Sequence, residues 1–262
     1  MAAPPDPSDV YDRAKAEGRR RLSMTPLEQA STGFIAGVTI VFGIVALAMA
    51  HELVLPAMGE GPATLAGALA FGTGMVFLVA GRSELFSENF FDPVAAAIDE
   101  RSTGVWGRLM RLWVLVLVLN LVGGAVMAAV FTVEGALPSG AHHTLVTVAE
   151  DIASKSAWAT LARAVAAGTL LTLLSYLLDA ADSAGSRMAL AYLAGFFLAV
   201  GAFDHVVVSA LHLLFGIWLG AAVTWADVGT NIALATVGNL AGGLLLMTLT
   251  HTVQAKSSPG GD

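Results

Sequence analysis

Six long apolar stretches constrain the fold of this chain more than any other feature. They cover residues 32–50, 63–81, 112–131, 157–178, 188–219 and 230–250. A bilayer core of roughly 30 Å is crossed by about 20 apolar residues in an α-helix, and each stretch meets that requirement. Apolar residues make up 56% of the chain and charged residues only 13%, which is not the balance of a soluble globular protein. The sequence therefore predicts an all-α membrane protein with six transmembrane helices.

Short polar segments separate these stretches, and no long linker divides them. We therefore expect a single transmembrane channel domain over residues 26–252, with disordered tails at residues 1–25 and 253–262. Lysine and arginine concentrate at both tails and in alternate loops, which the positive-inside rule assigns to the cytoplasm. These residues are Arg13, Lys15, Arg19, Arg20, Arg21, Arg101, Arg108, Arg111, Arg187 and Lys256. Both termini are expected to be cytoplasmic, and Lys155 is the main basic residue in the opposite loops.

An internal repeat relates the two halves of the chain. The segment LNLVGGAVMA at residues 119–128 recurs as GNLAGGLLLM at residues 238–247, which pairs Asn120 with Asn239. At nearly the same offset, Glu84 corresponds to Asp204. Because each half contains an odd number of spans, the second half must be inverted relative to the first. The sequence predicts two inverted three-helix repeats.

Two polar segments interrupt apolar spans. The segment GRSELFSENFFDP at residues 81–93 follows the second span, and AFDHVVVSALH at residues 202–212 lies inside the fifth. Lipid cannot satisfy the hydrogen bonds of irregular backbone, so such segments must be buried in protein or line a wet cavity. Spans two and five are therefore predicted to be broken helices beside a pathway.

The ionisable residues within these segments are candidates for function. His205 lies near the middle of an apolar region, where an ionisable side chain is a functional hypothesis by default; a structural hydrogen bond to a backbone carbonyl is the alternative. Asp204 is expected to cap the half-helix that follows it. For Arg82, an ion pair with Glu84 or Glu88 and the attraction of anions are equally good interpretations.

The residue inventory argues against several other classes of function. The chain has no cysteine, which excludes disulfides, thiolate metal sites and cysteine nucleophiles. His205 and His212 lie seven residues apart, but two ligands are too few for a metal site. No nucleophile with a base, no phosphate-binding loop and no basic stripe for nucleic acid are present, so neither an enzyme nor a cofactor is expected.

Four motifs resemble those of the formate/nitrite transporter family, most closely its YfdC-like branch. In chain order they are GRSELFSENFF, RLWVLVLVLNLVGG, DHVVVSALHLLF and TVGNLAGGLL, which together span about residues 80–250. The resemblance implies an aquaporin-like fold, a location in the inner membrane, and a homopentamer with one pore in each subunit.

The resemblance also implies roles for individual residues. His205 would be the central pore histidine, and Leu85 and Phe86 would narrow the cytoplasmic side of the pore. Other pore-facing positions would be Phe71, Met75, Ser87, Leu198 and Ser209. Arg187, where transporting members usually have a lysine, and Arg82 would attract anions. The family usually has threonine at the position of Ser87 and asparagine at the positions of Gly168 and Ser209.

These observations predict a membrane channel or transporter for small monovalent weak-acid anions of the formate, nitrite or acetate type. Moving a bare anion into a low-dielectric pore has an idealised cost of tens of kcal/mol. Protonating an acid of pKa about 4 at pH 7 costs roughly 4 kcal/mol, so the neutral acid passes more easily. Two alternatives are a pore for neutral solutes and a closed, non-conducting scaffold or sensor. The absence of an Asn-Pro-Ala pair at the two breaks disfavours the neutral-solute pore.

Overall fold

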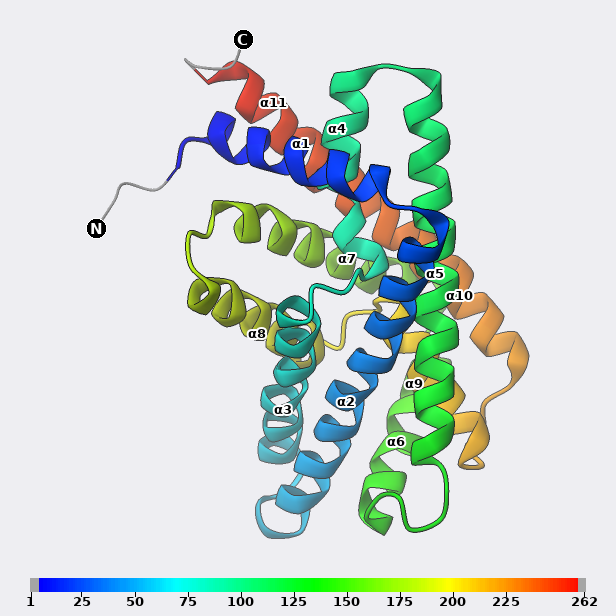
Figure 1. Ribbon diagram of the computed structural model, residues 1–262. Helices are drawn as coiled ribbons and strands as arrows, with labels where there is room; N and C mark the ends of the chain where they lie inside the picture. Colours follow the sequence, from blue (N-terminus) through cyan, green and yellow to red (C-terminus); the bar gives the residue numbers. More distant parts are fainter. Residues whose placement is uncertain (1–4, 259–262) are drawn as a thin grey trace.

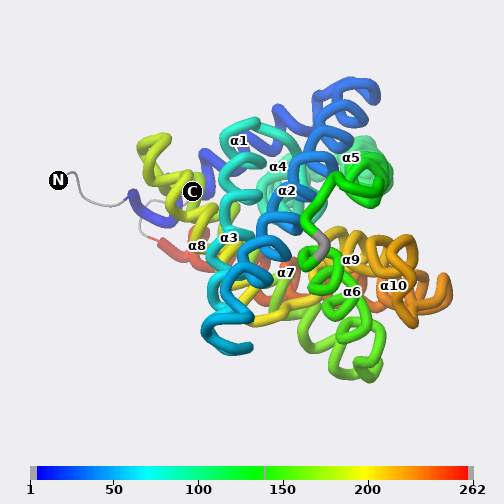
Figure 2. Tube along the Cα trace, turned by 90° about the horizontal axis from the view of Figure 1, so that it is seen from below, coloured from blue at the N-terminus to red at the C-terminus, as the bar shows by residue number. Residues whose placement is uncertain are grey.

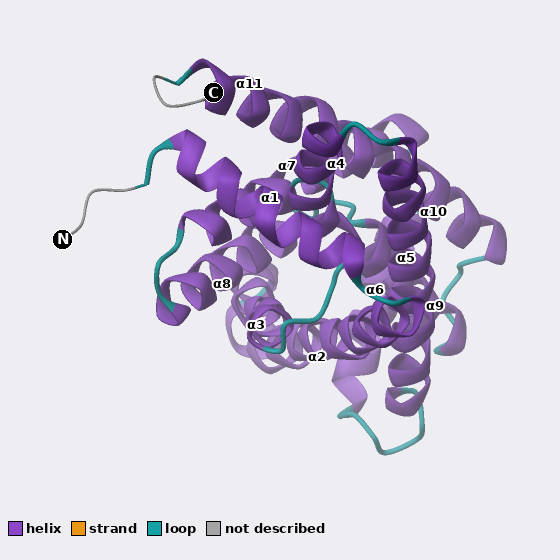
Figure 3. Cartoon of the chain, turned by 45° about the horizontal axis from the view of Figure 1, so that its top comes forward, coloured by secondary structure: helices purple, strands orange, loops and turns teal. Residues whose placement is uncertain are grey.

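The structure is a computed structural model that describes residues 5–258, and within this range it contains helices and no strand (Figures 1 and 3). The elements are, in chain order, α1 (Pro7–Ser23), α2 (Pro26–Met58), α3 (Glu60–Ala80), the 3₁₀-helix η1 (Phe86–Asn89), α4 (Asp92–Glu100), α5 (Thr103–Phe131), α6 (Ser139–Ala153), α7 (Ala157–Ala180), α8 (Ala184–Val200), α9 (Val206–Trp218), α10 (Trp225–Leu240), the π-helix η2 (Ala241–Thr248) and α11 (Leu249–Ser257).

Within residues 5–258, five helical segments are long and apolar enough to cross a membrane. They are α2, α3, α5, α7 and the continuous helix formed by α10, η2 and α11. The apolar helices α8 and α9 are shorter because a non-helical segment separates them. Viewed from below, α3 lies between α2 and α8 and packs against both (Figure 2). The prediction of an all-α membrane protein is therefore confirmed.

The amino-terminal segment differs from its prediction. Residues 7–23 form α1, which packs against α4 and lies beside α11 at one end of the molecule (Figure 1). Its apolar side chains Tyr11, Ala14 and Leu22 are buried, so the prediction of a disordered tail over residues 1–25 is wrong for this helix. The predicted tail at 253–262 is likewise helical up to Ser257; residues 1–4 and 259–262 lie outside the described range.

The two predicted interruptions have the same backbone geometry. Helix α3 ends at Ala80 and α8 ends at Val200, and each is followed by five non-helical residues before the next helix. Arg82 and Ala202 occupy the same place in the two breaks and both have left-handed backbones, with φ of 53° and 47°. The third residue of each break bonds back in the same way: Ser83 N–H donates to the Leu78 carbonyl at 3.3 Å, and Phe203 N–H to the Leu198 carbonyl at 3.1 Å.

One asparagine holds each break in place. The Asn120 side chain accepts from the Phe86 N–H at 2.9 Å and donates to the carbonyls of Gly33 and Glu84 at 2.8 and 3.0 Å. We call this set of bonds the asparagine clamp of the first break. Buried backbone groups need such partners because neither lipid nor water reaches them.

The second break has its own asparagine clamp. Asn239 accepts from the Val206 N–H at 2.9 Å and donates to the carbonyls of Ala164 and Asp204 at 2.8 and 3.0 Å. Both asparagines are fully buried, and their roles are the same bond for bond. The pairing of Asn120 with Asn239 in the sequence therefore has a structural counterpart.

Candidate functional site

Two cavities lie on opposite sides of the clamped breaks. The first, of about 520 Å³, is lined in part by His51, Lys155, Arg163, Ser209 and His212, and is called the histidine cavity below. The second, of about 460 Å³, is lined in part by Arg13, Arg20, Arg21, Arg82 and Arg187, and is called the arginine cavity. Each cavity therefore contains basic side chains.

Corresponding helices run in opposite directions between these cavities. Helix α3 starts at the histidine cavity, which Thr64 lines, and reaches the arginine cavity at Val79. Helix α8 starts at the arginine cavity, near Arg187, and reaches the histidine cavity at Leu198. The two breaks consequently approach each other from opposite sides.

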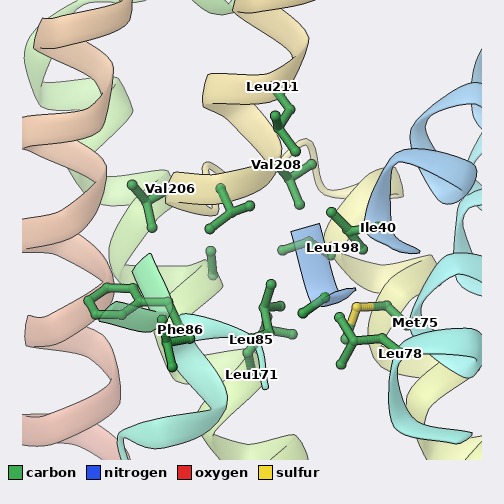
Figure 4. Close-up of a cluster of buried hydrophobic side chains, with 14 of the residues drawn as sticks. Ile40, Met75, Leu78, Leu85, Phe86, Leu171, Leu198, Val206, Val208 and Leu211 are labelled. Carbon is green, nitrogen blue, oxygen red and sulfur yellow. The ribbon is translucent and has the colours of Figure 1, made fainter. Parts of the chain in front are cut away.

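A layer of buried apolar side chains occupies the space between the breaks (Figure 4). Met75 and Leu78 come from α3, and Leu198 comes from α8, where it also lines the histidine cavity. Leu85, the last residue of the first break, and Phe86, the first residue of η1, belong to the same cluster and are at most 3% exposed. We call this group the apolar layer. Phe71, one turn before Met75, is buried too and lines the histidine cavity.

His205 and Ser87 form a polar contact inside this apolar surrounding. The His205 Nε2 lies 2.7 Å from the Ser87 Oγ, and both side chains are fully buried. His205 immediately precedes the Val206 amide held by Asn239, the place that Leu85 takes before the Phe86 amide in the first break. The His205 Nδ1 has no hydrogen-bond partner among the described residues. The ring therefore has one nitrogen whose hydrogen-bonding capacity is not used by the described residues.

On the side of the arginine cavity, α1 supplies the charges that neutralise the first break. Glu84 lies 3.1 Å from an Arg20 nitrogen and 3.3 Å from an Arg21 nitrogen. Arg21 also approaches Asp92 at 3.3 Å. Arg82 lines the cavity but is in no ion pair within the described range, so the suggested pairing of Arg82 with Glu84 or Glu88 is wrong.

Glu17 fastens these arginines to α1 itself. Its carboxylate lies 2.6 Å from an Arg20 nitrogen and 3.0 Å from Arg21 Nε. Burial alone would raise the pKa of Glu17, but the hydrogen bond from Arg20 and the charges of Arg21 and Arg20 outweigh it and lower the pKa to about 2. Glu17 therefore stays ionised at every physiological pH.

At the second break, Asp204 corresponds to Glu84, but its partner is a lysine and not an arginine. Asp204 Oδ1 accepts from the Lys155 Nζ at 2.7 Å, and Asp204 is 1% exposed. The residue at the N-cap of α9 is His205, whose side chain makes no capping hydrogen bond, and the Val206 N–H donates to Asn239, so the prediction that Asp204 caps this helix is wrong. Lys155 was missed as a site residue because it lies 49 positions from its partner. The sequence offered one signal for this role: Lys155 is the main basic residue in loops that otherwise contain little positive charge.

The remaining site residues of the sequence analysis divide between the two cavities. Ser209 lines the histidine cavity, and its hydroxyl donates to the His205 carbonyl at 2.8 Å. Arg187 lines the arginine cavity, away from His205. A Cβ at Gly168 would collide with the Asn239 carbonyl, which explains a glycine at this position. His212, to which no pore role was given, also lines the histidine cavity.

Two known proteins resemble this chain in sequence. The chain is 25% identical over 190 residues to the inner membrane protein YfdC of Escherichia coli (strain K12); the match covers 72% of this chain and 60% of that protein. It is 26% identical to the uncharacterized transporter YrhG of Bacillus subtilis (strain 168), with 94% and 92% of the two chains covered.

Solved structures have a similar fold. An FNT family ion channel superposes with a TM-score of 0.82 at 16% identity, covering 94% of this chain and 98% of that chain. A pentameric formate channel with formate bound gives 0.71 at 18% identity, with 87% and 96% covered. The family model of the formate/nitrite transporters matches residues 8–253, nearly the whole chain. The protein therefore belongs to the formate/nitrite transporter family.

Proposed function

We propose that this protein is a channel or transporter for small monovalent weak acids of the formate, nitrite or acetate type, and that the acid crosses the apolar layer in its protonated form beside His205. Membership of the family supports the general class of transport. One of the similar structures is a formate channel with formate bound, which supports the choice of acid.

The observation that carries the proposal is the contact between Ser87 and His205 inside the apolar layer. Ser87 lies on η1, directly after the first break, and His205 is the last residue of the second break. The two side chains meet at 2.7 Å, and neither residue lines a cavity. A hydroxyl and an imidazole can exchange hydrogen bonds with a neutral acid, which has one donor and two acceptor oxygens. The surrounding leucine and phenylalanine side chains offer nothing to a bare anion.

The energies favour the neutral acid. Transferring an unpaired carboxylate from water into an apolar layer costs tens of kcal/mol in the ideal limit. Protonating the same acid at pH 7 costs roughly 4 kcal/mol for a pKa of about 4. Passage as the acid is therefore the cheaper route even though the anion is the abundant species.

Basic residues on both sides would collect the anion before it is protonated. Arg82 and Arg187 line the arginine cavity, and Lys155 and Arg163 line the histidine cavity. Positive charge in a cleft raises the local concentration of anions, and this effect weakens as the ionic strength rises. These residues attract the substrate, whereas the apolar layer selects its neutral form.

The same proposal includes an architecture of six spans in two inverted three-helix repeats. The opposite directions of α3 and α8 and the two equal asparagine clamps support it. Helices α3 and α8 with their continuations would be the broken spans two and five. We further propose a homopentamer in the inner membrane, with both termini on the cytoplasmic side next to the arginine cavity.

A flux assay in proteoliposomes tests this function. Uptake of formate, acetate and nitrite is compared between wild type, His205→Asn, Phe86→Ala and empty vesicles. His251→Asn is the matched control, because His251 lies on α11, stacks on Tyr176 and lines neither cavity. We expect His205→Asn to slow the flux at least about tenfold, Phe86→Ala to admit larger acids, and the control to behave as wild type.

Three results would contradict parts of the proposal. Flux of every acid at the rate of empty vesicles would favour the closed scaffold or sensor. Swelling of the vesicles with water or glycerol, without uptake of any acid, would favour a pore for neutral solutes. Equal flux through wild type and His205→Asn would remove the histidine from the pathway.

A further inference from the structure

His212 lines the histidine cavity and has a ring nitrogen without a hydrogen-bond partner among the described residues. The side chain lies on α9, seven residues after His205, and is 4% exposed. It lines the cavity together with Lys155 and Ser209. Its Nε2 has no partner among the described residues. A buried polar atom without a partner is costly, which points to a guest that occupies this place.

The backbone fixes which nitrogen of the ring carries the hydrogen. The His212 Nδ1 lies 2.9 Å from the Val208 carbonyl oxygen. A carbonyl can only accept, so Nδ1 must be the donor in this bond. In the neutral ring, Nε2 is then a bare acceptor on a side chain that lines the cavity. An acceptor binds a hydroxyl and repels a carboxylate oxygen.

The other groups of this cavity complement such a guest. Lys155 and Arg163 are cationic, and His51, Glu60, His143 and Asp151 are the remaining titratable side chains in its lining. Lys155 is bound to Asp204, and His51 lies within 3.1 Å of Glu60, so both have protein partners. The third histidine of the lining, His143, is exposed, so water can satisfy its ring. His212 is buried, and its Nε2 has no partner among the described residues.

We propose that His212 binds the hydroxyl of a small protonated carboxylic acid in the histidine cavity, before or after the acid crosses the apolar layer. The proposal deepens the proposed function and rests on it for the class of ligand. His212 would select the protonated form of the acid in the histidine cavity, separately from His205 in the apolar layer. The acid donates its O–H to Nε2, and its second oxygen remains free for a cation or for water.

Two substitutions separate the binding nitrogen from the structural one. His212→Asn keeps an amide near the position of Nδ1, where it can donate to Val208, but removes the acceptor at the position of Nε2. His212→Gln places an amide oxygen near the position of Nε2. Both replacements are polar and smaller than or similar to histidine, which limits the disturbance of the packing around α9.

Binding is measured first, without any flux. The melting temperature of the purified protein in detergent is recorded at about pH 6 with and without acetate, and chloride at the same ionic strength is the control. We expect acetate to raise the melting temperature of wild type and of His212→Gln, and to leave that of His212→Asn unchanged. An equal rise in wild type and His212→Asn, or no rise in wild type, would overturn the proposal.

Flux distinguishes this proposal from the proposed function. We expect His212→Asn to raise the half-saturating acid concentration about tenfold, the worth of one hydrogen bond, and to leave the maximal rate unchanged. Normal flux with wild-type saturation in this variant would refute the role of His212 and leave the transport function intact. If acetate binding depends on His212 but the protein transports no acid, the role of His212 in binding stands and the proposed transport function is refuted.

Discussion

Asn120 and Asn239 make equivalent sets of three hydrogen bonds at the two breaks of the fold. Each asparagine accepts from one backbone N–H and donates to two backbone carbonyls. Each asparagine joins the break of its own half to the first long helix of that half, α2 or α7. The breaks are therefore fixed by side chains on α5 and α10, distant in the sequence from the irregular segments themselves.

Replacement of either asparagine by alanine is expected to destabilise the protein by about 2–4 kcal/mol, because buried backbone groups lose their partners. Thermal unfolding in detergent measures the change. Asn231→Ala is the matched control: Asn231 lies on α10 and is buried, but its side chain has no partner among the described residues. A loss of stability in the control as large as in Asn239→Ala would show that the clamp bonds contribute little.

Removal of the Lys155 ammonium is expected to cost about 3–5 kcal/mol, because it leaves the Asp204 carboxylate buried and unpaired. Lys155→Ala is compared with the double variant Lys155→Ala/Asp204→Asn, again by thermal unfolding. The double variant should recover most of the loss, since its neutral amide no longer needs a cation. If the double variant is less stable than Lys155→Ala, the ion pair is not the reason for the loss.

A methyl group at Gly168 is expected to destabilise the protein by about 1–3 kcal/mol, because it would collide with the Asn239 carbonyl. Gly107→Ala on α5 is the control, since nothing lies within 4 Å of a Cβ there. That change should be neutral or stabilising by up to about 1 kcal/mol, because alanine favours the helix. Similar unfolding temperatures for the two variants would mean that the crossing of α7 and α10 relaxes easily.

The docking of α1 should lose the contribution of Glu17 only at acidic pH. The folded-state pKa of Glu17 is about 2, below its ordinary value of 4.5. A depressed carboxyl pKa gives stability that is present above the unfolded value and lost as pH falls towards the folded one. We therefore expect the stability contribution of Glu17 to be constant from neutral pH to about 5, and to fall between 4.5 and 2.

Trypsin cleavage within α1 checks the role of this carboxylate, because the helix contains several arginines. Glu17→Gln should be cut severalfold faster than wild type near pH 8, whereas Glu28→Gln, at the exposed start of α2, should not differ from wild type. Equal rates in all three proteins would show that α1 is held without the help of Glu17.

Several features of the fold could be predicted from the sequence because they follow from solvation. The apolar stretches indicated the spans, and polar residues at 81–93 and 202–212 indicated the breaks, since lipid forbids irregular backbone that lacks partners. The repeat of Asn120 and Asn239 was visible as well. Its function as a hydrogen-bond clamp was not, because that depends on which backbone groups the folded chain brings within reach.

Other features depend on contacts that no local pattern reveals. Residues 7–23 look like a polar tail, yet they form a helix whose Arg20 and Arg21 neutralise Glu84, a residue more than sixty positions away. Lys155 and Asp204 are separated by 49 residues. The free nitrogen of His212 follows from one turn of α9 and its bond to Val208, which the sequence spacing alone does not determine.

The equivalence of Leu85 and His205 has one more consequence. The two breaks have the same backbone geometry, but they differ at the residue before the amide that the asparagine holds. The first break has the hydrocarbon side chain of Leu85 there, and the second has the imidazole of His205. At this position, the same backbone geometry therefore holds an apolar side chain in the first break and a hydrogen-bonding side chain in the second. In the proposed passage, an acid would meet the His205 imidazole of the second half together with the Ser87 hydroxyl of the first half, so both halves of the chain would set its orientation.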